Sequence, residues 1–197
     1  ANKLSAARTK AATTMAAEIN EQLHRLSMEG AELLIQLTPV NPEGYRLNGL
    51  EEIEFLLATN PGQPHKMLAK IASGGELSRV SLAIQVVAAS HSKIPTLVFD
   101  EVDVGIGGST ADIVGQLLKQ LGDRGQVISV THQPQVAAHA HHHYRASKVI
   151  EDNNAESLMS SLDHQQRVAE LARMLGGAKV TDQTVSHASE LLSLAST

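Results

Sequence analysis

The chain has 197 residues, of which 42% are hydrophobic and 2% aromatic, so it can build one sizeable globular domain around an aliphatic core. It has no cysteine, which excludes disulfides and thiol chemistry, and no apolar run near the roughly 20 residues of a membrane span. The formal net charge of −5 lacks the basic surplus typical of nucleic-acid-binding domains. Any nucleic acid contact of the whole protein is therefore expected outside this chain or in a local patch.

The segment from Leu4 to Met28 predicts a long amphipathic helix, because it lacks Pro and Gly and its apolar residues recur at helical spacing. The apolar positions are Leu4, Ala7, Ala11, Met15, Ile19, Leu23 and Leu26. An ordinary surface helix and the end of a coiled coil both fit this alanine-rich seam. We expect Gly30 to stop the helix, and the abrupt start indicates a longer parent chain. Residues 1–29 are thus expected to end a coiled-coil helix, and residues 30–197 to form a lobe.

The rest of the chain predicts an α/β lobe that begins with an antiparallel hairpin. The hairpin strands are expected at 32–37 and 52–57, with a turn at 42–44 and a loop from residue 60 to about 72. Expected next are a helix with an apolar face over 77–87, a strand over 96–99, a helix over 110–121, a strand over 127–130, a strand pair over 144–162 that turns at 152–154, and two helices split at Gly176-Gly177. Such alternation favours a parallel sheet with ligand chemistry at the carboxyl ends of its strands.

The first segment with potential chemistry is Ser73-Gly74-Gly75-Glu76, at the start of a predicted helix. Taken alone, Ser73 with Glu76 is a helix capping box, and two glycines before a helix are unremarkable. A Gly-Gly step at a helix N-terminus also exposes backbone N–H groups and the positive end of the helix dipole, which suit an incoming phosphate. Both interpretations stay open at this point.

The second segment is a buried-type strand that ends in two acids, Asp100 and Glu101, and continues to Asp103. Acids next to an apolar strand are costly unless they have partners. The functional interpretation is a Walker B element, in which Asp100 holds the Mg²⁺ of a bound nucleotide and Glu101 orients and deprotonates the attacking water. The alternative is structural: one acid caps the following loop and the other is solvated.

The third segment is Thr131-His132, which follows the next predicted strand. A lone histidine in such a place is usually structural or simply exposed. Because carboxyl ends of neighbouring parallel strands meet at one sheet edge, however, His132 and the two acids can face the same edge. A histidine there can hydrogen-bond a γ-phosphate or the attacking water.

The order of these segments resembles the signature motif, Walker B element, D-loop and switch histidine of ABC ATPases. The detailed sequence of these segments resembles that of the RecN family of SMC-like DNA-repair ATPases, over a stretch from about Glu52 to Leu192. The segments that carry the resemblance are 59–62, 71–79, 99–106, 131–137, 142–144 and 173–177. Gln133 stands where the family usually has an apolar residue, and we expect this departure not to touch the chemistry.

A Walker A loop needs Gly-Lys followed by Ser or Thr, and no lysine of this chain follows a glycine. The main phosphate cradle of a nucleotide is therefore expected from another segment. In the family this segment is an N-terminal lobe beyond the coiled coil. The resemblance thus makes this chain one half of a nucleotide site.

The resemblance implies the C-terminal lobe of an ABC/SMC-type ATPase head, an α/β lobe with a parallel sheet, flanking helices and a β-hairpin on a coiled-coil stub. Two such heads would sandwich ATP and Mg²⁺ between them. Asp100, Glu101 and His132 would act on the nucleotide of their own head. The signature residues that would reach the nucleotide of the opposite head are Ser73, Gly74, Gly75 and Glu76. Asp103 would help to couple the two sites.

The implied partners are the N-terminal Walker A lobe of the same protein, a second head in a homodimer, and DNA through the full-length protein, with no membrane. The implied setting is the cytoplasm, at the nucleoid, in double-strand-break repair and recombination. Two alternatives remain: a nucleotide-gated DNA-tethering or dimerisation module with incidental turnover, and the ATPase subunit of another ABC family, such as a membrane transporter. Glu101 favours the enzyme, because a structural clamp needs no carboxylate beside the Mg²⁺ ligand.

A group of histidines offers a competing hypothesis, a site for Zn²⁺ or Ni²⁺. Its members are His139, His141, His142 and His143. Structural zinc sites use tetrahedral ligand sets at spaced positions, usually with Cys. The chain has no Cys, and consecutive residues of a strand point to opposite faces. The sequence therefore disfavours a physiological metal site.

Overall fold

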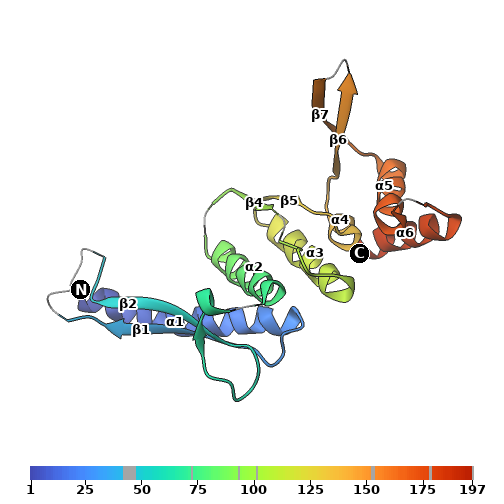
Figure 1. Cartoon of the computed structure of the whole chain (residues 1–197). Helices are drawn as coiled ribbons and strands as arrows, with labels where there is room; N and C mark the ends of the chain where they lie inside the picture. Colours follow the sequence, from blue (N-terminus) through green and yellow to red (C-terminus); the bar gives the residue numbers. More distant parts are fainter. Residues whose placement is uncertain are drawn as a thin grey trace. The chain divides into compact units, whose positions relative to one another are not determined.

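The computed structural model describes residues 1–41, 48–71, 73–92, 94–100, 102–151, 154–177 and 179–196. The chain divides into two compact units, residues 1–94 and 95–197, and Figure 1 labels most of their elements. The first unit contains α1 (Asn2–Arg25), β1 (Glu32–Pro39), β2 (Glu51–Ala58), β3 (Lys66–Met67), the 3-10 helix η2 (Leu68–Lys70) and α2 (Gly74–Ser90). The second contains β4 (Thr96–Asp100), α3 (Gly108–Gly122), β5 (Gln126–Val130), α4 (Pro134–Ala138), β6 (Tyr144–Glu151), β7 (Asn154–Ser161), α5 (His164–Gly176) and α6 (Asp182–Ala195).

The expected α/β class is confirmed, with a parallel strand pair, antiparallel hairpins and flanking helices. β1 and β2 pair antiparallel, and β6 and β7 form the second predicted antiparallel pair. The predicted turn at 42–44 and residues 152–153 of the turn predicted at 152–154 lie outside the described residues. No helix in the described ranges has the length and apolar character needed to cross a membrane.

Helix α1 ends at Arg25, earlier than the stop expected at Gly30. Ser27 has a positive φ of 60°, and Met28 donates its N–H to the Leu23 carbonyl at 3.0 Å. This is the Schellman ending of a helix, with serine in the left-handed position that glycine usually occupies. The helix therefore stops through its own capping geometry, before the glycine is reached.

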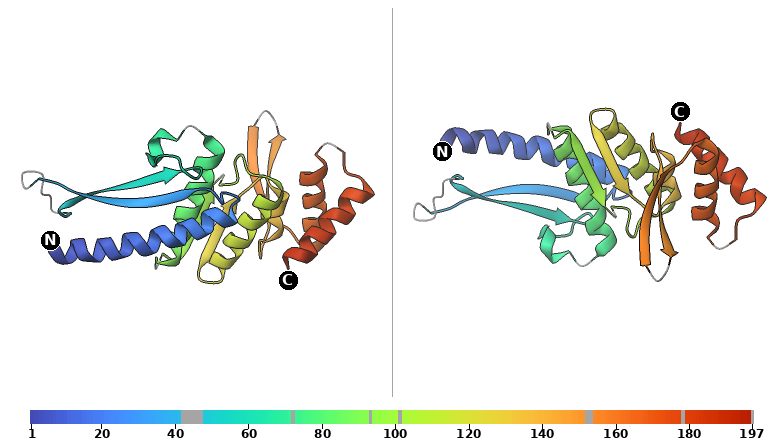
Figure 2. Two further views of the ribbon diagram at one scale, coloured as in Figure 1. Left: turned by 90° about the horizontal axis from the view of Figure 1, so that it is seen from below. Right: turned by 90° about the horizontal axis from the view of Figure 1, so that it is seen from above.

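The second half of α1 belongs to the core of the first unit. Ile19 and Leu23 are fully buried, and α1 contacts both β1 and α2 and runs alongside the β1–β2 hairpin (Figure 2). The side-chain amide of Asn20 connects α1 to β1 through two hydrogen bonds. Its Oδ1 accepts from the Leu33 N–H at 2.7 Å, and its Nδ2 donates to the Leu33 carbonyl at 3.1 Å. Leu4 in the first half of the helix is exposed. Part of the predicted apolar seam is thus left uncovered.

The β4–β5 pair of the second unit is parallel, and Asp100 lies opposite Val130 in its register. One face is covered, with Phe99 buried and α3 in contact with β5. The other face presents exposed Val98, Ile128 and Val130. Because parallel sheets are normally covered on both faces, this apolar face is one that a further layer would cover.

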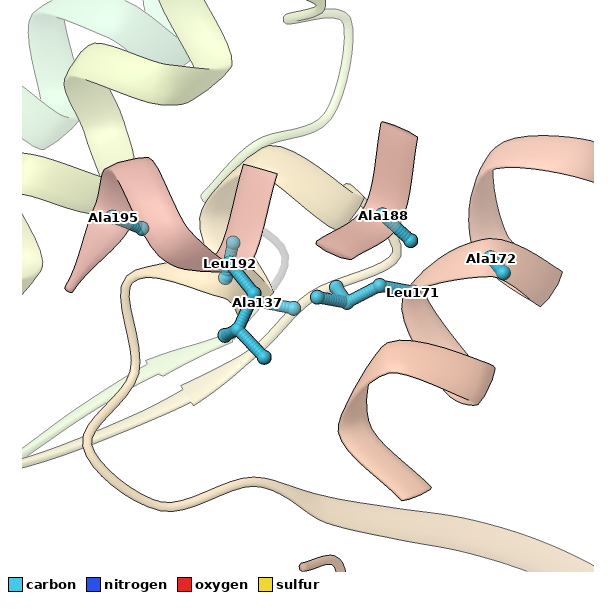
Figure 3. Packing of buried hydrophobic residues seen from close by; sticks show 7 residues of the cluster. Ala137, Leu171, Ala172, Ala188, Leu192 and Ala195 are labelled. Carbon is cyan, nitrogen blue, oxygen red and sulfur yellow. The ribbon is translucent and has the colours of Figure 1, made fainter. Parts of the chain in front are cut away.

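An alanine-rich core joins α4, α5 and α6 (Figure 3). Its buried members are Ala137, Ala138, Leu171, Ala172, Ala188, Leu192 and Ala195. Alanines let the three helices approach closely, and α4 starts at Pro134. This core therefore anchors the chain directly after Gln133, where the candidate site ends.

Glu170 of α5 is only 5% exposed although it carries a carboxylate. Arg173 forms an ion pair with it, in which Nη2 of Arg173 lies 2.6 Å from Oε1 of Glu170. The hydrogen bonds of Arg173 hold the pKa of Glu170 below its ordinary value of 4.5. Glu170→Gln is expected to lower the free energy of unfolding by about 1–3 kcal/mol at neutral pH. Because the folded-state pKa is lowered, this contribution is present above the unfolded-state pKa and is lost as pH falls through the folded-state pKa.

Urea unfolding of the wild type and of Glu170→Gln, at neutral pH and below about pH 4, measures this effect. The difference between the two proteins should shrink on acidification. The exposed Glu190 of α6 supplies the matched control, Glu190→Gln, which should change little. A Glu170→Gln difference that does not vary with pH would show that the ion pair is not its source.

Candidate functional site

The candidate site of the second unit lies at the carboxyl ends of β4 and β5. Since Asp100 is level with Val130, the loop Thr131-His132 leaves the sheet beside the end of β4. The shared edge predicted from the sequence is therefore present. The Asp100 side chain is exposed at this edge. Glu101, the expected general base, lies outside the described residues.

Asp103 is completely buried, although it carries a carboxylate. Its Oδ2 accepts a hydrogen bond from Thr131 Oγ1, and its Oδ1 lies 3.7 Å from His132 Nδ1. That Oδ1 has no hydrogen-bond partner within the described part of the chain. The His132 ring is 63% exposed, so its far side is open to a ligand. The geometry thus joins the predicted D-loop aspartate to the predicted switch histidine.

Gln133 extends this network, contrary to the expectation that it stays clear of the chemistry. Its backbone N–H donates to Thr131 Oγ1 at 2.9 Å. Its side-chain Nε2 donates to the Ile106 carbonyl at 2.8 Å and lies 3.4 Å from His132 Nε2. The structure thus places Gln133 against His132, a contact that the sequence analysis did not expect. An isolated polar residue at an expected apolar position was the only signal that pointed to it.

The predicted signature segment lies in the first unit and opens α2. Ser73 is the N-cap, and its Oγ accepts a hydrogen bond from the Glu76 N–H at 3.4 Å, which is one of the two bonds of the predicted capping box. Ser73 and Gly74 are both exposed, and a Cβ added at Gly74 would meet no atom within 4 Å. The N-terminus of α2 is therefore both capped and open, which also meets the requirement of the phosphate interpretation.

The histidines at 139–143 have separate surroundings. His139 is buried, and its Nε2 lies 2.7 Å from Asp112 Oδ1. His143 is partly buried, and this burial lowers its pKa. Across the ranges that the structure describes, no three His, Cys, Asp or Glu side chains converge in a way that could hold a metal ion. The arrangement of this segment gives the metal hypothesis no support.

Curated relatives cover nearly the whole chain. The DNA repair protein RecN of Xylella fastidiosa (strain 9a5c) is 53% identical over 192 residues, which are 98% of this chain and 34% of that protein. RecN of Haemophilus influenzae is 47% identical over 98% of this chain and 35% of its own length. RecN of Bacillus subtilis is 38% identical over 92% of this chain and 34% of its own length. The chain thus spans about one third of the length of these relatives, and no protein-family model matches it.

Solved structures of SMC heads share the fold. The Smc head domain of Pyrococcus yayanosii aligns with a TM-score of 0.63 at 23% identity, over 83% of this chain and 29% of that one. A chain from work on ATP-driven dimerization and DNA-stimulated activation of SMC ATPases aligns with a TM-score of 0.59 at 21% identity. The alignment covers 85% of this chain and 94% of that one. At these identities the matches establish the fold alone. The chain is thus homologous, over almost its whole length, to a C-terminal segment of RecN DNA repair proteins, and it has the mixed α/β fold of SMC ATPase heads.

Proposed function

We propose that this chain is one half of the ATPase head of a RecN-type DNA repair protein. The observation that carries the proposal is the network at the β4–β5 edge, where Asp103 is completely buried against Thr131 and His132. Burying a carboxylate is costly unless its environment compensates. An aspartate that joins the loop after β4 to the loop after β5 in this way suits a site that must hold these two loops in register.

Asp100 fits the role of Mg²⁺ ligand, because Mg²⁺ in nucleotide sites takes one or two carboxylates together with phosphate oxygens. Its carboxylate is exposed at the end of a parallel strand, where ligands of such sheets bind. A bound Mg²⁺ neutralises the charge that develops on the transferred phosphoryl group. In this proposal Asp100 is the residue of this chain that holds the ion.

Glu101 and His132 have the roles closest to the reacting atoms. Glu101 takes a proton from the attacking water as the water oxygen bonds the γ-phosphorus and the bond to the ADP oxygen breaks. His132, whose side chain is 63% exposed, hydrogen-bonds the water or the γ-phosphate through a ring nitrogen. Asp103 helps to couple the site to that of the opposite head.

A composite site accounts for two features of the chain. It has no Gly-Lys step for a Walker A loop, so an N-terminal lobe of the same protein would supply the phosphate cradle. That lobe would also cover the exposed Val98, Ile128 and Val130 of the two-stranded sheet. Residues 30–197 would then be the C-terminal lobe, and the exposed Leu4 supports the interpretation of residues 1–29 as the end of a coiled coil.

The remaining partners follow from the same proposal. A second head would place its ATP against the open N-terminus of α2, so that Ser73, Gly74, Gly75 and Glu76 act in trans. DNA would be contacted through the full-length protein in double-strand-break repair and recombination, since this chain has a net charge of −5. The setting would be the cytoplasm, at the nucleoid.

The composite site is tested by Ser73→Arg in the complete two-lobed head. The arginine would fill the space at the N-terminus of α2 that the opposite head's γ-phosphate needs. We expect ATP binding to persist, ATP-driven dimerisation to be lost, and turnover to fall about 10²-fold or more. Fluorescent-nucleotide binding, light scattering and phosphate release measure the three quantities.

Two matched variants separate this effect from a folding defect. Ser81→Arg places the same side chain on an exposed position of α2, away from its N-terminus. Ser73→Ala removes the cap, which costs about 1 kcal/mol of stability, without adding bulk. If Ser73→Arg hydrolyses ATP as fast as Ser81→Arg does, the signature segment at Ser73 does not contribute to the ATP site.

A further inference from the structure

We propose that Arg145 and Arg173, at the root of the β6–β7 hairpin, form a contact site for the phosphate backbone of DNA. The two arginines belong to a hairpin-root cluster, which also contains His143, Arg167 and Glu170. The inference rests on the proposed function for its partner, because there the full-length protein contacts DNA. It deepens that function by naming a surface of this chain that would take part, on elements other than the β4–β5 edge.

Two elements bring the hairpin-root cluster together. In α5, Arg167, Glu170 and Arg173 recur at intervals of three residues, which places them on one face of the helix. His143 directly precedes β6, and Arg145 is the second residue of that strand. Alternate residues of an extended segment point to the same side. The cluster thus lies where the start of β6 meets α5.

Glu170 orients the two arginines without using up their donors. Its carboxylate is 5% exposed, and Arg173 donates to it through Nε at 3.0 Å and Nη2 at 2.6 Å. A guanidinium carries five N–H groups, so three of those on Arg173 remain for a ligand. Arg145 Nη1 lies 3.7 Å from Glu170 Oε2, which is longer than a hydrogen bond. The side chains of Arg173 and Arg145 are 60% and 48% exposed, so both are open to a partner.

The hairpin-root cluster holds more positive than negative charge, because three guanidinium groups share it with one carboxylate. Burial lowers the pKa of His143, and the charge of Arg167 lowers it further, against the opposing effect of Glu170. Burial also lowers the pKa of Arg167. An anion at this place would offset the excess positive charge.

Phosphate is the anion that this arrangement fits best. The planar fork of a guanidinium matches the oxygens of a phosphate and can bind two of them at once. The chain as a whole has a net charge of −5, so the excess at the hairpin root is local. A local patch of arginines is how an acidic chain can contact the phosphates of DNA.

The salt dependence of DNA binding by the complete two-lobed head tests the site. Fluorescence anisotropy of a short labelled DNA duplex, without nucleotide, gives Kd across a series of NaCl concentrations. Each lost phosphate contact should reduce the slope of log Kd against log salt by about 0.9, which weakens binding about 8-fold at about 0.1 M salt. We expect this for Arg145→Gln and for Arg173→Gln, and about twice the change in slope for the double variant. Arg124→Gln, at an exposed position before β5, is the matched control.

Two variants keep a folding defect apart from the loss of a contact. Arg145→Gln leaves the close pair of Glu170 and Arg173 intact, so its ATP turnover without DNA should equal that of the wild type. Arg173→Lys keeps the charge but loses the planar fork, and it should retain the wild-type slope, because the slope counts charges.

A double variant with the wild-type slope, or a head that does not bind the duplex, would overturn the contact site and leave the half ATP site untouched. Polyglutamate that displaces the duplex as well as unlabelled DNA does would assign the arginines to an acidic protein segment, and would overturn the nucleic-acid assignment. A head that binds DNA with the expected slopes but does not hydrolyse ATP would refute the proposed ATPase and leave the contact site standing.

Discussion

Glu101→Gln in the complete head is expected to bind ATP and to form the ATP-engaged dimer, but to hydrolyse ATP about 10²- to 10⁴-fold more slowly, because the proposed general base is removed. Glutamine keeps the size of the side chain and can still hydrogen-bond the water, but it cannot take the proton. The dimer should therefore accumulate. Single-turnover phosphate release gives the rate, and light scattering in ATP gives the dimer fraction.

The same variant separates the enzyme from a nucleotide-gated tether. If the cycle of hydrolysis is required, cells that carry Glu101→Gln should repair double-strand breaks poorly, although their heads engage. If tethering suffices, these cells should survive breaks as the wild type does. The exposed Glu156 of β7 provides the matched control, Glu156→Gln, which should retain full turnover. Unchanged turnover in Glu101→Gln would exclude Glu101 as the base.

The sheet edge was predictable because its signals are local and strong. Two short apolar strands followed by polar residues can be recognised from the sequence, and the alternation of helices and strands predicts that they are parallel. The structure pairs Asp100 with Val130 as this requires. The burial of Asp103 was not predictable, because it depends on Thr131, which is far along the chain.

Other features depend on geometry that local patterns do not carry. The stop of α1 was assigned to Gly30 because glycine is the usual left-handed residue, yet Ser27 takes that conformation. Gly30 instead permits close approach of a loop: a Cβ there would lie 2.7 Å from Pro61 Cδ. The contact of Gln133 with Ile106 likewise joins two loops that are separate in sequence.

The central claim is that this chain holds half of an ATP site, and reconstitution tests it most directly. ATP hydrolysis would be measured for this chain alone, for the N-terminal lobe alone, and for an equimolar mixture, with Asp100→Asn in the mixture as the control for the Mg²⁺ ligand. Neither half should exceed background, because one lacks the Walker A loop and the other lacks Asp100, Glu101 and His132. The mixture should hydrolyse ATP and lose this activity with Asp100→Asn. Robust, stoichiometric hydrolysis by this chain alone, retained after repurification, would contradict the half-site.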